Sequence, residues 1–103
     1  MTTAETKFDF EQLILRLERN HQCVLRLSRN LNSYKYEPRN YDCFTRLREL
    51  KSSFAALAKK QMALFDKIQS QSLSFDKAVQ NVNSSIQDFH NLEKQMAAYL
   101  LDL

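Results

Sequence analysis

The chain has 103 residues, of which 44% are hydrophobic and 26% charged, and a formal net charge of +3. This length fits a single domain, residues 1–103, and the apolar content is too high for a disordered chain. The sequence contains no glycine, which excludes phosphate-binding loops, dinucleotide fingerprints and nucleophile elbows, and disfavours the tight hairpins of sheet-rich folds. We therefore predict an all-α protein that is not an enzyme.

The first helix is predicted over residues 7–33, with Thr6 as its N-cap. Its apolar residues recur at alternating spacings of three and four, which is the pattern of a coiled-coil seam. One member of the seam is polar. Asn20 lies either at the seam edge or inside, where a buried asparagine sets register and partner number, and both interpretations stay open. The seam consists of Phe10, Leu13, Leu17, Asn20, Val24, Leu27, Leu31 and Tyr34.

Residues 32–39 form the clearest break in the helical pattern, because they hold the only proline, Pro38. Proline suits the first position of a helix, so Pro38 is expected to open a second helix over residues 38–69. A short connection makes the two helices antiparallel neighbours. Two glutamines, Gln61 and Gln71, interrupt the second seam and are expected at its edge or in solvent. The seam begins with Leu47, Leu50, Phe54, Leu57, Gln61, Leu64 and Ile68.

The same heptad phase continues to the end of the chain and predicts a third helix over residues 74–102, after a weak patch at residues 69–74. If the patch bends, three helices of similar length form an antiparallel three-helix bundle of the coiled-coil hairpin type. If it does not, a short first helix packs on one continuous helix of about 65 residues, roughly 97 Å long. The matching helix lengths and the wide apolar faces favour the bundle.

Basic residues cluster around the predicted connection at residues 32–39. The net charge over residues 22–51 is +4, and three tyrosines are interleaved with the basic residues. Such a cluster is typical of the solvated end of any helical hairpin, but it can also bind an acidic protein surface or an anionic membrane. Nucleic acid ranks below both, because the sequence has no motif that reads DNA or RNA. The residues of this basic tip are Arg26, Arg29, Lys35, Arg39 and Arg46.

The third predicted helix is apolar on two faces, whereas one apolar stripe is sufficient for a surface helix of a monomer. We expect the chain's own core to use residues such as Val82 and Leu92. The opposite face is then expected to bind a helical protein partner, in a hetero-complex rather than a homo-oligomer. The predicted partner-binding residues are Phe89, Met96, Tyr99, Leu100, Leu101 and Leu103.

Cysteine and histidine are too few and too scattered to predict a metal site. Structural zinc sites use four ligands in close pairs, which His21, Cys23, Cys43 and His90 do not provide, and no motif indicates a cofactor. In the antiparallel hairpin the two cysteines lie at different heights, beyond disulfide reach. The sequence shows no signal-peptide pattern, and no apolar run approaches the roughly 20 residues that a membrane span needs. Together with the free thiols, this predicts a cytoplasmic protein, with the nucleus as second choice.

These observations predict a non-catalytic protein-interaction subunit or adaptor that assembles into a larger complex through helix–helix, coiled-coil packing. The alternative is a stand-alone three-helix module that takes an amphipathic peptide in a groove between helices, or an acidic or phosphorylated ligand on the basic tip. The mass of the pure protein in solution separates the two functions, because a well-behaved monomer favours the module.

Overall fold

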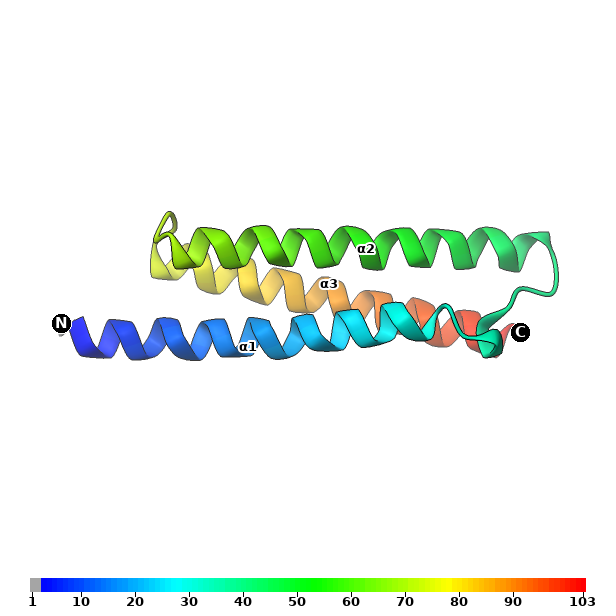
Figure 1. Ribbon diagram of the computed structural model, residues 1–103, viewed down its shortest axis with the longest axis horizontal. Coiled ribbons are helices and arrows are strands. Elements are labelled where there is room, and N and C mark those ends of the chain that lie inside the picture. Colours follow the sequence, from blue (N-terminus) through cyan, green and yellow to red (C-terminus); the bar gives the residue numbers. More distant parts are fainter. Residues whose placement is uncertain (1–2) are drawn as a thin grey trace.

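Three α-helices lie side by side in an elongated bundle of 58 × 18 × 18 Å (Figure 1). The computed structural model describes residues 3–103 and assigns them to α1 (Thr3–Asn30), α2 (Tyr41–Gln69) and α3 (Phe75–Leu101), with a short 3₁₀ helix, η1 (Tyr34–Tyr36), between α1 and α2. Each α-helix packs against both others, and the described residues contain no strand. The predicted all-α three-helix bundle is confirmed.

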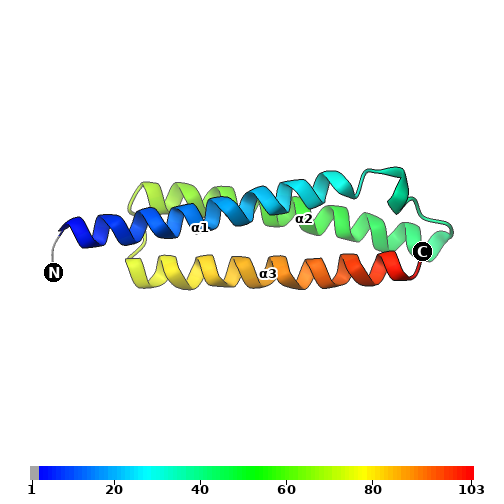
Figure 2. The same ribbon diagram turned by 90° about the horizontal axis from the view of Figure 1, so that it is seen from below.

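The chain runs along the bundle, turns back and turns again (Figures 1 and 2). As a result α1 and α3 begin at the end that carries the α2–α3 connection, and the first turns of α1 extend past this connection. The C-terminus lies at the other end, beside the α1–α2 connection. We call this second end of the bundle the tip, and define it as residues 29–51 together with residues 99–103.

The start of α2 is fixed by Asn40, whose side-chain oxygen accepts a hydrogen bond of 2.9 Å from the backbone N–H of Cys43. This is the usual N-cap arrangement, which satisfies an amide left free by the first helical turn. Pro38 therefore lies in the connection, and the prediction that it opens the second helix is wrong. The prediction for Thr6 as an N-cap is also wrong, because α1 already begins at Thr3.

The end of α2 shows why the chain bends where no glycine or proline occurs. Gln71 adopts the left-handed conformation, with φ of 58°. Its N–H donates to the carbonyl oxygen of Ile68 at 3.1 Å, and the N–H of Ser72 donates to that of Lys67 at 2.9 Å. These two bonds form a Schellman motif, which ends helices. The alternative of one continuous helix through residues 69–74 is therefore wrong, and Ser74 caps the next helix by accepting from the N–H of Lys77.

The core consists of two apolar clusters at the two ends of the bundle. The cluster near the tip contains Phe54, Leu57 and Tyr99 among its buried members, and the far cluster contains Leu17, Ile68 and Val82. The members of each come from all three helices. Between the two clusters in sequence, on every helix, lie the polar residues Asn20, His21, Gln61 and Ser85.

Candidate functional site

The tip is held together by contacts between the α1–α2 connection and the last turn of α3. Tyr99 is fully buried, and its hydroxyl donates a hydrogen bond of 2.6 Å to the backbone carbonyl oxygen of Tyr36. The guanidinium of Arg46 lies 5.6 Å from the centre of the Tyr99 ring and donates to Asp102 at 2.7 Å. The connection is therefore attached to α3 by one partly buried hydrogen bond, and the Arg46–Asp102 ion pair joins the first turns of α2 to the end of α3.

Burial raises the pKa of the Tyr99 hydroxyl above its ordinary value, and the electrostatic interaction with Cys43 raises this pKa further, while the positive charge of Arg46 opposes the shift. The phenol therefore keeps its proton well beyond neutral pH and remains a hydrogen-bond donor to Tyr36. Both partners of the Arg46–Asp102 pair are partly exposed, at 39% and 61% of their side-chain surface. Water screens such a pair, so it contributes little stability.

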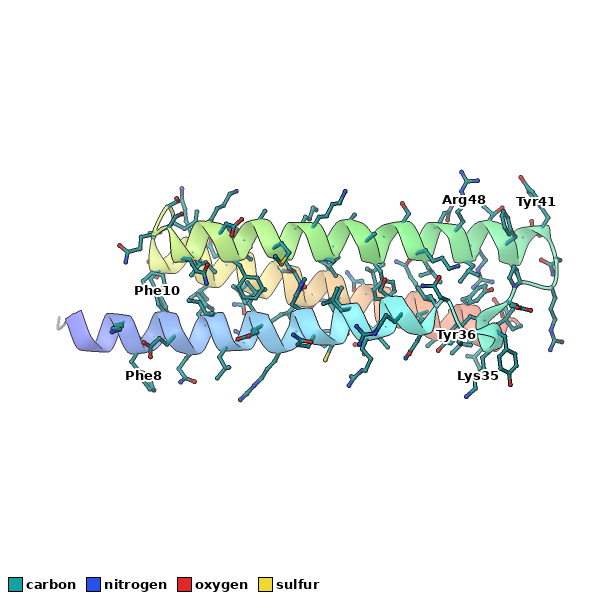
Figure 3. All side chains as sticks on the ribbon, in the orientation of Figure 1. Phe8, Phe10, Lys35, Tyr36, Tyr41 and Arg48 are labelled. Atoms are coloured by element: carbon teal, nitrogen blue, oxygen red, sulfur yellow. The ribbon has the colours of Figure 1, made fainter. Side chains whose placement is uncertain are left out.

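Large apolar side chains are exposed at this end of the bundle. Tyr34 and Tyr41 are 79% and 80% exposed, Phe44 is 51% exposed and Leu101 is 87% exposed. Figure 3 shows Tyr41 directed away from the bundle, at the start of α2, with Lys35 near Tyr36 across the tip. Several large apolar side chains exposed at one end of a monomer favour an interaction site there. The tip is therefore the candidate functional site.

A surface pocket of about 350 Å³ opens at the tip between the α1–α2 connection and the first turns of α2. Its apolar lining comes from Leu31, Pro38, Phe44 and Leu47, and its charged lining from Glu37, Arg48 and Lys51. Arg48 and Lys51 belong to the basic stretch of residues 22–51 but not to the five predicted residues of the basic tip, and the sequence pattern does not reveal that Phe44 is half-exposed beside them. Phe44 lies at the flank of the second seam, where the heptad pattern does not decide burial.

The predicted basic residues are arranged in different ways. Arg29 lies in the last turn of α1, Lys35 in η1 and Arg39 in the connection, and all three are exposed. Arg26 lies 3.7 Å from the sulfur of Cys23. Arg46 faces α3 and is paired with Asp102, so it belongs to the tip's internal contacts rather than to its free basic surface.

The predicted partner-binding stripe of the third helix is largely internal. Phe89, Met96 and Tyr99 are at most 5% exposed and pack in the same cluster as Leu92. We placed them opposite the chain's own core, which is wrong. The alternating three- and four-residue spacing puts them on the same stripe as Val82 and Leu92, and α1 and α2 cover that stripe. Leu100 and Leu101 remain exposed, and Leu103 packs partly against the core.

The polar layer is the second feature with functional chemistry, and we define it as the buried residues His21, Gln61 and Ser85 together with the half-buried Asn20. The Gln61 amide nitrogen donates to the Asn20 side-chain oxygen at 2.8 Å and to the Ser85 hydroxyl at 3.1 Å. Its oxygen lies 2.9 Å from His21 Nδ1, which must donate the hydrogen. The expectation that Gln61 lies at a seam edge is wrong, because this side chain is fully buried. Gln71 is exposed, as expected.

Metal-binding chemistry is not assembled in the part of the chain that the structure describes, where no group of three or more His, Cys, Asp or Glu side chains comes together. Cys23 is half-buried, Cys43 is buried, and neither forms a disulfide. Among these same residues no helix is both long and apolar enough to cross a bilayer. Comparison of the chain with protein-family models, curated proteins and solved structures finds no match.

Proposed function

We propose that the protein is a non-catalytic interaction subunit or adaptor that docks onto other proteins in a larger assembly with the tip of its bundle. The observation that carries this proposal is the group of large apolar side chains exposed at the tip, Tyr34, Tyr41, Phe44 and Leu101. Such side chains gain free energy when a partner removes them from water, at about 25 cal/mol per Å² of apolar surface.

A self-contained core supports the choice of the tip over the helix faces. Within the described residues, every buried side-chain nitrogen and oxygen has a hydrogen-bond partner. The apolar stripe of each helix is also covered by the other two helices. The bundle therefore needs no partner to complete its interior. Of the eight large hydrophobic side chains that are exposed among the described residues, five lie at the tip, and the other three, Phe8, Leu15 and Met62, are spread over α1 and α2.

Charge favours a different protein, rather than a second copy, as the partner. The side chains of the tip, residues 29–51 and 99–103, include six Lys and Arg against four Asp and Glu, a net charge of +2. A symmetric dimer through this surface would place the same basic side chains against one another, which costs free energy. A partner with an acidic surface avoids that repulsion. We propose a cytoplasmic or nuclear location on the weaker ground that both cysteines are free.

The stand-alone binding module is the second candidate, and the pocket beside Phe44 favours it. A monomeric bundle could take a short ligand there without being a permanent part of an assembly. Because the core is complete in either case, the pure protein is expected to be a soluble monomer for both functions, and sedimentation of the protein in a cell lysate separates them. Sedimentation with a larger complex supports the subunit, whereas sedimentation as a free monomer supports the module.

Site-specific photo-crosslinking in cells that express the protein tests the proposed function. A photoreactive phenylalanine analogue replaces Tyr41 at the tip or, in a matched control, Lys59 on the outer face of α2, since both positions are exposed. We expect a protein adduct from position 41 that is absent from position 59. Equal adducts at both positions, or none at either, would remove the support for a protein-binding tip.

A further inference from the structure

We propose that the pocket beside Phe44 binds a short acidic segment of a partner protein, which inserts one bulky apolar side chain between the α1–α2 connection and α2 and pairs its flanking carboxylates with Arg48 and Lys51. This inference rests on the proposed function and names the chemistry of the partner. The feature that the pocket recognises is one bulky apolar residue flanked by carboxylates.

The lining of the pocket fits one apolar anchor. Leu31 and Leu47 are buried beneath it, at 1% and 7% exposure, whereas Phe44 keeps 51% of its surface open to solvent. A volume of about 350 Å³ lies at the lower end of the range for small-ligand pockets, which suits one large side chain rather than a cofactor. An inserted leucine or phenylalanine would cover the open face of Phe44.

The charges beside the pocket favour an acidic ligand. Arg48 is exposed and Lys51 is half-buried. Within the described residues Arg46 forms an ion pair with Asp102 and His90 contacts Glu93, whereas neither Arg48 nor Lys51 pairs with an acidic side chain. Glu37 is the one acidic lining residue, which leaves an excess of positive charge. Carboxylates of a bound segment would form ion pairs with Arg48 and Lys51.

A second pocket has the same charge balance as the pocket at the tip, so charge alone does not distinguish the two. A pocket of about 290 Å³ between α2 and α3 is lined by Lys60, Lys67 and Asp88, so it carries the same balance of charge. Its α3 wall consists of Asn81, Ser84 and Ser85 with Asp88, and it offers no half-exposed aromatic side chain. Of these two pockets, the one at the tip joins free cations to a half-exposed aromatic side chain.

A protein segment fits this site better than an anionic membrane does. The apolar floor is recessed between two chain segments, and a planar headgroup layer cannot insert a single anchor into it. Acidic side chains also interrupt the basic surface, with Glu37, Asp42 and Glu49 among the seven basic residues of positions 22–51. These carboxylates repel anionic lipids, whereas a peptide can place its own charges between them.

The test begins with selection of random 12-residue peptides displayed on phage against the full-length protein. Selected peptides are then measured by fluorescence anisotropy against variants. We expect enrichment of peptides with one bulky apolar residue flanked by Asp or Glu. Phe44→Ser and the double change Arg48→Glu, Lys51→Glu should each weaken binding about tenfold or more, because each removes a desolvated contact. Wild-type affinity should fall as salt rises.

Matched controls keep the result specific to the pocket. Met62→Ser removes an apolar side chain of similar exposure, 53%, from the same helix, and Lys59→Glu with Lys60→Glu makes the same charge change away from the tip. Both should alter affinity less than about twofold, as for distant surface positions. Circular dichroism verifies that each variant is folded.

Three results would overturn the inference. The first is selection of peptides that lack the acidic–apolar pattern, and the second is equal binding of the selected peptides to all variants. The third is binding of the wild type to phosphatidylserine vesicles but to no peptide, with loss of the vesicle binding in the pocket variants. If Tyr41 still yields a protein adduct when the peptide selection fails, the pocket inference falls while the proposed function stands. Loss of both results removes the proposed function as well.

Discussion

The side-chain amide of Gln61 on α2 donates a hydrogen bond to the side-chain oxygen of Asn20 on α1, at 2.8 Å. This bond crosses a helix interface in the middle of the bundle, and the same amide reaches Ser85 on α3. One glutamine therefore connects all three helices. Sliding any helix by one turn breaks these bonds and buries the freed polar groups, so the polar layer opposes other registers.

Replacing Gln61 alone should destabilise the bundle. Gln61→Leu leaves the Nδ1–H of His21 and the oxygen of Asn20 without their partner, and the free energy of unfolding should fall by about 1–3 kcal/mol. Urea unfolding followed by circular dichroism measures the change. Gln80→Leu, at an exposed position of α3, is the control and should stay within about 0.5 kcal/mol of wild type. An unchanged midpoint of urea unfolding for Gln61→Leu would show that water can replace the hydrogen bonds of Gln61 in the polar layer.

Replacing the whole layer should have a different effect. With Asn20, His21 and Gln61 changed to Leu and Ser85 to Ala, no polar group remains to be satisfied, and stability should equal or exceed that of wild type. The register constraint is then lost, so sedimentation should detect more than one oligomeric species. A single species of unchanged mass would show that the apolar seams alone set the register.

Tyr99→Phe tests the hydrogen bond that attaches the tip to α3. It removes the 2.6 Å bond to the Tyr36 carbonyl, which should cost about 0.5–1.5 kcal/mol at neutral pH. Because folding raises the pKa of Tyr99, the stability linked to its proton is complete below the unfolded pKa near 10, and is lost as pH rises through the folded pKa.

The pH dependence gives this variant a readout of its own. Wild type should lose stability in urea above about pH 10, and Tyr99→Phe should lose less over the same interval. Tyr41→Phe is the control, since Tyr41 is 80% exposed, and should follow wild type. If Tyr99→Phe and wild type decline in parallel, the alkaline loss belongs to other groups.

Gln71→Gly should stabilise the protein by up to about 1 kcal/mol, because a left-handed conformation strains every residue that has a Cβ atom. This gain exceeds the loss from the greater flexibility of glycine in the unfolded chain. The melting midpoint measured by calorimetry should therefore rise. Lys59→Gly, at an exposed position inside α2, should instead lower it, since glycine in a helix interior costs about 1 kcal/mol. Equal effects of the two changes would contradict the Schellman cap.

The fold class could be predicted because it depends on a pattern that the whole chain shares. Heptad spacing and the absence of glycine specify helices and their apolar faces, whereas the end of a helix depends on one or two residues. Gln71 has no sequence feature that marks a left-handed position, so the bend after Gln69 stayed one of two alternatives. Pro38 and Asn40 competed for the start of α2, and the side-chain cap of Asn40 prevailed.

The site was predicted less well, for a physical reason. A heptad position tells that a side chain is covered, but not whether the cover comes from the same chain or a partner. Phe89 and Met96 were therefore assigned to a partner although α1 and α2 cover them. Gln61 shows the converse, because a buried amide is tolerated only when Asn20, His21 and Ser85 are brought to it by the register of three helices.

The end of α3 provides the last prediction, since it separates residues of the core from residues available to a partner. Met96 is 5% exposed within the cluster near the tip, whereas Leu100 and Leu101 are 39% and 87% exposed. Met96→Ser should lower the free energy of unfolding by about 2–5 kcal/mol, because it leaves a cavity and buries a hydroxyl. For a domain of this size each kcal/mol lowers the melting midpoint by about 4–8 °C.

The double change Leu100→Ser, Leu101→Ser should leave the melting midpoint within a few degrees of wild type and weaken the crosslink expected from position 41. Its control is the double change Ala97→Ser, Ala98→Ser at exposed positions one turn earlier, which should alter neither property. A large loss of stability from the two leucine changes would place them in the core with Met96. Unchanged crosslinking would confine the partner surface to the α1–α2 connection and the start of α2, where Tyr34, Tyr41 and Phe44 lie.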